Sequence, residues 1–111
     1  MKIKTQNENK GLFSDKKYKI NEKIHKLAGV IYDQPSRTTI EIAKNSHIDD
    51  PYGIYMNHSF LPNCAIKDGY ILSICNIDED DELTFNYNEN ETVMACPFID
   101  NATKQHVNGK E

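Results

Sequence analysis

Apolar residues along the chain occur in short runs, separated by stretches rich in Asn, Lys, Asp and Glu. Residues 38–42 alternate polar and apolar side chains with a period of two, as a half-buried strand does. Two apolar runs, 64–66 and 70–75, flank an Asp-Gly pair, which predicts a β-hairpin. Residues 83–87 are a further predicted strand after an acidic turn at 78–82. With no long amphipathic helix and no internal repeat, the pattern predicts a mainly β domain.

Other parts of the chain carry weaker signals. Ile24, Leu27 and the pair Val30-Ile31 are candidate core positions. Gly29, which interrupts them, indicates a bulge or a close backbone contact. Residues 1–10 are expected to be a frayed entry or an edge strand. Residues 45–53 are expected to be a loop, and the residues after 98 a mobile tail.

Composition and charge narrow the classes of partner and location. The 111 residues fit one domain, and no apolar run approaches the ~20 residues of a membrane span. The N-terminal residues 1–7 lack the apolar stretch of a secretory signal, so a cytoplasmic or nuclear location is expected, without secretion. The net charge of −4 argues against direct nucleic acid binding and suits a basic partner, such as a lysine-rich protein tail.

Cysteine and histidine residues give no sign of a metal site. The three cysteines form no C-x-x-C pair and are expected to be separate buried thiols: Cys64, Cys75 and Cys96. Three histidines outside the motifs below are expected at the surface: His25, His47 and His106. One thiol near the C-terminus and one distant histidine fall short of the four ligands of a structural zinc ion, so no metal is expected.

The strongest chemical signal is in residues 55–63, where four polar side chains stand among apolar ones. Polar groups are costly to bury unless each has a hydrogen-bonding partner. An irregular loop held together by its own Asn, Ser and His side chains would satisfy them, and so would a binding site.

This segment resembles the Asn-His-Ser-x-x-Pro-Asn signature of the SET-domain protein-lysine methyltransferases, matched here by Asn57, His58, Ser59, Pro62 and Asn63. The second signature of that family, Glu-Leu-Thr-Phe-Asp-Tyr, is similar to residues 82–87, with Asn86 in place of Asp. Three further segments resemble the family more weakly. Residues 9–13 are similar to its Gly-x-Gly-Leu/Val-Phe turn, residues 27–29 to its Tyr-x-Gly, and residues 94–98 to its Met-Ala-Glu-Pro-Phe segment.

The resemblance implies a fold and a set of binding residues. Residues 1–98 would form a minimal SET domain with a knot-like C-terminal crossing, and 99–111 a C-terminal tail without the zinc-binding cysteines of many family members. The implied cofactor is S-adenosylmethionine. Its binding residues would be Lys10, Gly11, Leu12, Phe13, Asn57, His58, Tyr87 and Phe98.

The implied activity is methyl transfer to a lysine side chain of a protein substrate. Tyr87 would be the catalytic residue, orienting the amine through its hydroxyl. Tyr55, Phe60 and Phe85 are candidate walls of the lysine channel. Such an apolar channel favours the neutral amine that the reaction needs.

Departures from the family pattern leave an alternative open. Leu27 replaces an aromatic residue, Asn9 replaces the first glycine of the turn, and the zinc segment is absent. These features would suit a degenerate SET-like domain that binds a cofactor or a protein without turnover. We also hypothesise a homodimer, in which a second subunit supplies the missing channel wall. A third alternative is a small β domain with a structural role, whose motifs are coincidental. It would require two long strings to match by chance and in the right order.

Overall fold

The computed structural model describes residues 1–6 and 8–110, most of which lie in short strands, turns and loops. In chain order the elements are β1 (Lys2–Gln6), β2 (Asn9–Phe13), β3 (Lys23–Lys26), β4 (Val30–Tyr32), β5 (Ile40–Ala43), β6 (Ser46–Asp49), the 3-10 helix η1 (Gly53–Tyr55), β7 (Asn57–His58), β8 (Cys64–Lys67), β9 (Tyr70–Ser73), β10 (Thr84–Phe85), α1 (Tyr87–Asn90), β11 (Phe98–Ile99) and β12 (His106–Val107). The predicted mainly β class is confirmed.

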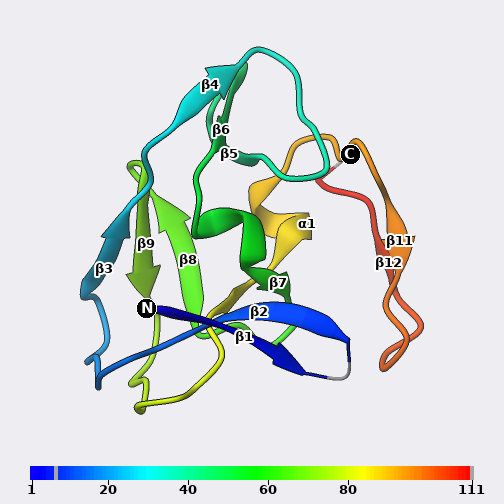
Figure 1. Cartoon of the computed structure of the whole chain (residues 1–111). Helices are drawn as coiled ribbons and strands as arrows, with labels where there is room; N and C mark the ends of the chain where they lie inside the picture. Colours follow the sequence, from blue (N-terminus) through cyan, green and yellow to red (C-terminus); the bar gives the residue numbers. More distant parts are fainter. Residues whose placement is uncertain (7, 111) are drawn as a thin grey trace.

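Small sheets surround the two short helices. Figure 1 shows η1 and α1 near the middle, the sheet β3-β9-β8 on the left, β4-β6-β5 above, the pair β1-β2 below and the pair β11-β12 on the right. Side chains from several of these sheets meet in one core. Its fully buried members include Leu12, Met56, Ile71, Ile77 and Leu83.

The hairpin β8-β9 confirms the prediction made from the Asp-Gly pair. Its strands pair antiparallel, from Cys64 opposite Ser73 to Lys67 opposite Tyr70. Asp68 and Gly69 form the turn with φ values of 53° and 79°. Two successive positive φ values are typical of the type I′ turn, whose twist matches that of the flanking strands.

Strands β7 and β10 make the crossing on which the site depends. They are parallel, with Asn57 opposite Thr84 and His58 opposite Phe85. In the sequence, 25 residues lie between the end of β7 and the start of β10, and they include the hairpin β8-β9. The backbone N–H of Ser59 extends the pairing by donating to the Phe85 carbonyl at 3.1 Å. The two predicted signatures therefore lie side by side, as the SET resemblance implies.

Residues 45–53 are not the loop that the sequence predicted. Residues 46–49 form β6, the central strand of the sheet β4-β6-β5. His47 and Ile48 are both buried, so the prediction of a surface His47 is also wrong. A four-residue strand with a buried histidine shows no clear period, and this hid it from the sequence analysis.

The predicted core between β3 and β4 is only partly correct. Leu27 is buried and Ile24 is half-buried, but Val30 and Ile31 are 59% and 56% exposed. They belong to β4, an edge strand that pairs with β6 alone. The close contact predicted at Gly29 is confirmed, because a Cβ atom there would lie 2.1 Å from the Asp49 carbonyl oxygen.

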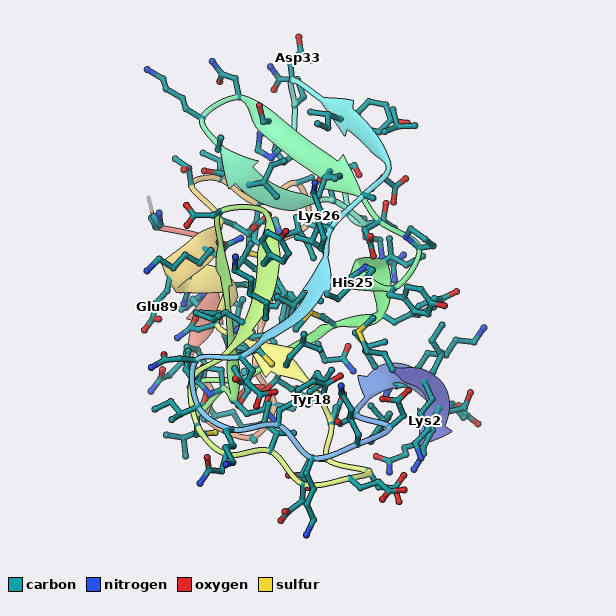
Figure 2. All side chains as sticks on the ribbon, turned by 90° about the vertical axis from the view of Figure 1, so that its left-hand side faces the viewer. Lys2, Tyr18, His25, Lys26, Asp33 and Glu89 are labelled. Carbon is teal, nitrogen blue, oxygen red and sulfur yellow. The ribbon has the colours of Figure 1, made fainter. Side chains whose placement is uncertain are left out.

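A buried carboxylate ties the start of η1 to β3. Asp50 is 1% exposed, and its side chain accepts hydrogen bonds from the backbone amides of Ala28, Tyr52 and Gly53. The fourth partner is Nε2 of His25, 2.9 Å from Oδ2. Figure 2 shows the face of the molecule on which His25 lies. His25, which was predicted at the surface, is therefore half-buried and bonded to Asp50.

The C-terminal residues contain regular structure that the sequence did not predict. β11 pairs antiparallel with β12, and Val107 is fully buried. The Asn88 side chain donates to the His106 carbonyl at 3.0 Å, and the Lys110 amide donates to the Glu91 carbonyl at 2.8 Å. Two-residue strands are too short for a recognisable alternation of apolar and polar positions.

The cysteines are free thiols, but they differ from the prediction in their burial. Cys64 is buried, and burial raises the pKa of its thiol to about 12. Cys75 and Cys96 are exposed. Within the described residues, no helix has the length and apolar character needed to cross a membrane.

Candidate active site

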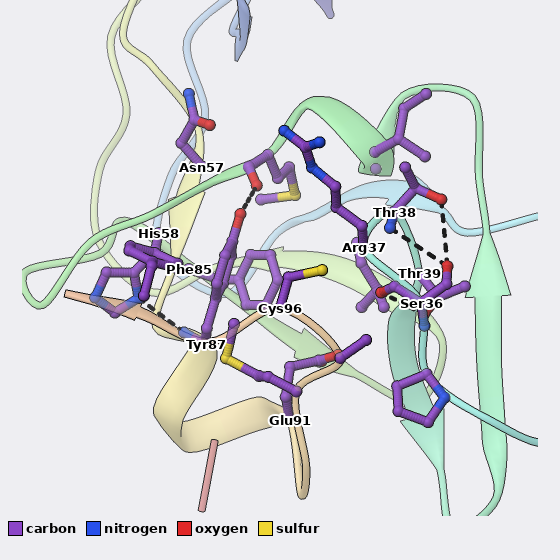
Figure 3. A pocket seen from close by; sticks show the side chains of 18 of the residues that line it. Ser36, Arg37, Thr38, Thr39, Asn57, His58, Phe85, Tyr87, Glu91 and Cys96 are labelled. Atoms are coloured by element: carbon purple, nitrogen blue, oxygen red, sulfur yellow. Dashed lines mark hydrogen bonds between the residues drawn. The ribbon is translucent and has the colours of Figure 1, made fainter. Parts of the chain in front are cut away.

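A cavity of about 800 Å³ opens where α1, β7 and the segment before β11 meet. This volume is within the usual range for small-molecule sites. Figure 3 shows most of its lining side chains. The lining residues are Asn9, Pro35, Ser36, Arg37, Thr38, Thr39, Ile40, Gly53, Ile54, Met56, Asn57, His58, Phe85, Tyr87, Glu91, Met94, Ala95, Cys96, Pro97, Phe98 and Asp100.

Tyr87 is the first residue of α1 and is held at both ends. Its hydroxyl donates to the Met56 carbonyl at 2.5 Å, and its backbone N–H donates to Nδ1 of His58 at 3.0 Å. The preceding residue, Asn86, caps the helix by accepting from the Asn88 amide. Met56, just before β7, and His58, in β7, therefore fix the phenol ring in the cavity wall.

Burial raises the pKa of the Tyr87 phenol well above its usual range, and the nearby carboxylates of Glu91 and Glu82 raise this pKa further. The phenol thus keeps its proton at neutral pH and donates a hydrogen bond to the Met56 carbonyl. Its oxygen retains lone pairs that can accept a further hydrogen bond.

His58 is a neutral imidazole surrounded by aromatic rings. Because Nδ1 accepts the Tyr87 amide, the ring hydrogen is on Nε2. Nε2 is buried and has no hydrogen-bonding partner among the described residues. The centroids of the Phe60, Tyr87 and Phe98 rings lie 4.3, 5.2 and 6.1 Å from that of His58. Burial lowers the pKa of His58, although the charge of Asp100 acts in the opposite direction.

Asn57 uses its amide nitrogen within the protein. Nδ2 donates to the Lys10 carbonyl at 3.0 Å and to Oε2 of Glu82 at 2.8 Å. Gly11 makes room for this arrangement, since a Cβ atom there would lie 2.5 Å from Glu82 Oε2 and 3.2 Å from Asn57 Nδ2. Oδ1 of Asn57 accepts no hydrogen bond from the described residues and remains available to a ligand.

The second asparagine of the first signature has a structural role. The Asn63 amide nitrogen donates to the Glu82 carbonyl at 2.7 Å, and its Oδ1 accepts from the Thr84 amide at 2.9 Å. This side chain therefore joins the end of the first signature to the start of the second, and it stabilises the crossing rather than lining the cavity.

Five of the residues predicted from sequence line this one cavity: Asn57, His58, Phe85, Tyr87 and Phe98. The other predicted residues lie around it. The Lys10 carbonyl accepts a hydrogen bond from Asn57, and Gly11 lies next to the Asn57 side chain. Leu12 and Phe13 are buried in the core.

Two predicted channel walls do not line the cavity. The Tyr55 ring is half-buried, with Lys10 Nζ 5.7 Å from its centroid. Phe60 packs edge-on against His58. Of the three predicted walls, only Phe85 lies at the cavity surface.

The sequence analysis missed Glu91, a cavity residue that is 6% exposed. Its Oε2 accepts from the Glu41 amide at 3.0 Å and from the Asn90 side chain at 2.5 Å. Burial raises the pKa of Glu91, and the charge of Glu41 raises it further. No motif signals this residue; its position four after Tyr87, at the end of α1, is the only clue in the sequence.

Arg37 and Cys96 also line the cavity without having been singled out as site residues. Arg37 comes from the loop before β5, and Cys96 takes the position of Glu in the Met-Ala-Glu-Pro-Phe likeness. Among the described residues, no group of three His, Cys, Asp or Glu side chains is placed to hold a metal ion.

Comparisons with known proteins concern the family and the fold. The family model of the SET domain matches residues 5–88. Among solved structures, the chain is similar to a candidate histone methyltransferase from Plasmodium falciparum, with 23% sequence identity and a TM-score of 0.62. That likeness covers 80% of this chain and 97% of the other, and at this identity it shows the fold alone. No curated protein sequence matches the chain.

Proposed function

The chain belongs to the SET-domain family, and from this premise we propose that it is a protein-lysine methyltransferase that uses S-adenosylmethionine. The observation that carries the proposal is the parallel pairing of β7 with β10. It brings Asn57 and His58 of one signature beside Tyr87 of the other, at the wall of one cavity. The solved structure that shares this fold is itself described as a candidate histone methyltransferase.

The cavity residues fit the cofactor. S-adenosylmethionine, when bound, supplies a methyl group on a positively charged sulfur. Asn57 Oδ1 is an acceptor without a partner among the described residues, suited to an ammonium group, and His58 Nε2 is a buried donor in the same state. Phe98 provides an aromatic surface next to His58. These three residues would hold the cofactor, with Gly11 giving space behind Asn57.

Tyr87 would position the amine that accepts the methyl group. Its hydroxyl hydrogen is engaged by the Met56 carbonyl, so the oxygen presents lone pairs to an amine N–H. The lysine must be neutral to react, although its ordinary pKa is about 10.4. The buried ring of Phe85 and the half-buried ring of Tyr87 would disfavour the ammonium form by desolvation. Orientation of this kind is a large part of catalysis when a reaction needs little acid or base chemistry.

We propose a protein with an accessible lysine as the substrate. The net charge of −4 would attract a basic segment at long range. We also propose a homodimer. Leu27 is in the core and Tyr55 and Phe60 do not line the cavity, so a second subunit would complete the channel.

A second candidate function, cofactor or protein binding without turnover, is favoured by the same incomplete channel. Isothermal titration with S-adenosylmethionine and transfer of a labelled methyl group to a panel of basic proteins separate the two. The enzyme predicts both binding and transfer. Binding without transfer would favour the degenerate domain, and loss of binding in Asn57→Ala would assign that binding to the cavity.

A further inference from the structure

We propose that Glu91 receives the positively charged amine of the substrate, so that the part of the cavity beyond Tyr87 selects alkylammonium groups. This inference rests on the proposed function and adds a substrate-binding residue that neither signature contains. It concerns recognition of the amine, not the transfer step.

Tyr87 lines the cavity between two groups of labelled residues in the view of Figure 3. Asn57 and His58 lie to the left of the Tyr87 ring in this view, and Cys96 and Glu91 lie to its right. Asn57 and His58, which we propose above as cofactor residues, belong to the first side. The second side is therefore available to the substrate.

The Glu91 carboxylate is buried but incompletely paired. Oε2 accepts the Glu41 amide and the Asn90 side chain, whereas Oε1 accepts no hydrogen bond from the described residues. Although the side chain is only 6% exposed, it lies at the cavity surface. A buried carboxylate with an unused oxygen is costly, and a cation entering the cavity would remove that cost.

The charges around Glu91 favour a cation. Glu41 adds a second carboxylate, held by the Thr92 amide at 2.9 Å and the Thr92 hydroxyl at 2.8 Å. Lys110 acts in the opposite direction, but only its backbone N–H contacts Glu91, through the Glu91 carbonyl. Arg37 also lines the cavity, and none of the ion pairs among the described residues joins it to Glu91.

Binding and reaction make opposite demands on this residue. A carboxylate stabilises the ammonium form of the incoming lysine, which strengthens binding but does not assist its deprotonation. Glu91→Gln should therefore raise KM for the protein substrate while leaving kcat unchanged or higher. A purely structural role would instead lower stability and reduce the apparent kcat through the folded fraction, with KM unchanged.

The direct test uses n-butylammonium as a probe of the lysine side chain and n-butanol as its neutral counterpart. Titrations are followed by NMR at the Met94 methyl group and the Tyr87 ring, without cofactor or turnover. We expect n-butylammonium to bind the wild type more tightly than n-butanol does, and Glu91→Gln to weaken it by about fivefold or more.

The matched control is Glu41→Gln, which removes the same charge from a residue outside the cavity lining. Each glutamine keeps a carbonyl oxygen for the backbone amide that the glutamate accepts. Because Thr92 engages the Glu41 carboxylate and Glu41 does not line the cavity, this control should weaken n-butylammonium binding less than Glu91→Gln does, by about twofold at most. Melting curves of both variants establish that they are folded.

Equal affinity of the two probes for the wild type, or unchanged n-butylammonium affinity in Glu91→Gln, would overturn the proposal for Glu91. Absence of methyl transfer by the wild type would contradict the proposed function, and the probe titration would still decide the role of Glu91.

Discussion

The backbone amide of Tyr87 donates a hydrogen bond to Nδ1 of His58 at 3.0 Å. Tyr87, in the second signature, is thus held by the side chain of His58, in the first signature. The same interaction fixes the imidazole tautomer and leaves Nε2 as a buried donor. Two segments that are distant in sequence depend on each other for their geometry.

Replacing His58 with alanine should destabilise the crossing. The Tyr87 amide would lose its acceptor, and the space between the rings of Phe60 and Phe98 would be left unfilled. We expect a loss of about 2–4 kcal/mol in the free energy of unfolding, measured by urea denaturation. The exposed His106 supplies the control, and His106→Ala should cost less than about 0.5 kcal/mol. Equal losses in the two variants would contradict the role given to His58.

The Asp50 cluster should make stability depend on pH in the acidic range. Burial alone would raise the pKa of Asp50, but the amides of Ala28 and Gly53, together with His25, lower it below its ordinary value. A carboxyl group with a lowered pKa in the folded state stabilises the protein above its unfolded pKa of about 3.9, and this contribution is lost as pH falls through the folded pKa.

Asp50→Asn removes that contribution and places an amide nitrogen against hydrogen-bond donors. We expect it to lower the free energy of unfolding at pH 7 by about 2–4 kcal/mol. The difference from the wild type should narrow as the pH falls below about 4. Urea denaturation at pH 7, 5 and 3 measures it, and a difference that is constant with pH would count against this assignment.

Gly11→Ala should affect ligand binding more than folding. The new methyl group would displace the Glu82 carboxylate, the flexible end of a side chain, and so disturb its hydrogen bond with Asn57. We expect the free energy of unfolding to change by less than about 1 kcal/mol. Affinity for S-adenosylmethionine, measured by isothermal titration, should fall by about tenfold. An unchanged affinity would show that the Asn57 arrangement is not needed for the cofactor.

Much of the site was predictable because two long strings of specific residues carry it. Asn57, His58 and Tyr87 were assigned to one pocket from the SET resemblance, and the structure brings them together at one cavity. The hairpin β8-β9 was predictable from local chemistry, since an Asp-Gly pair adopts the positive φ values of a tight turn.

The remaining features depend on tertiary contacts that leave no local pattern. β6 is a strand because β4 and β5 pair with both its edges, and this arrangement buries His47. Val30 and Ile31 are apolar but lie on an edge strand. Glu91 is a charged residue, which a sequence pattern assigns to the surface, yet its contacts with β5 bury it at the cavity.

The most direct test of the account is mass spectrometry of basic proteins incubated with S-adenosylmethionine and either the wild type or Tyr87→Phe. We predict methyl groups on lysine with the wild type and a reduction of about 100-fold or more with the variant, which lacks the hydroxyl that we propose positions the amine. Lysine methylation at equal rates by the two proteins would contradict the role of Tyr87, and no methylation by a wild type that binds the cofactor would contradict the enzyme itself.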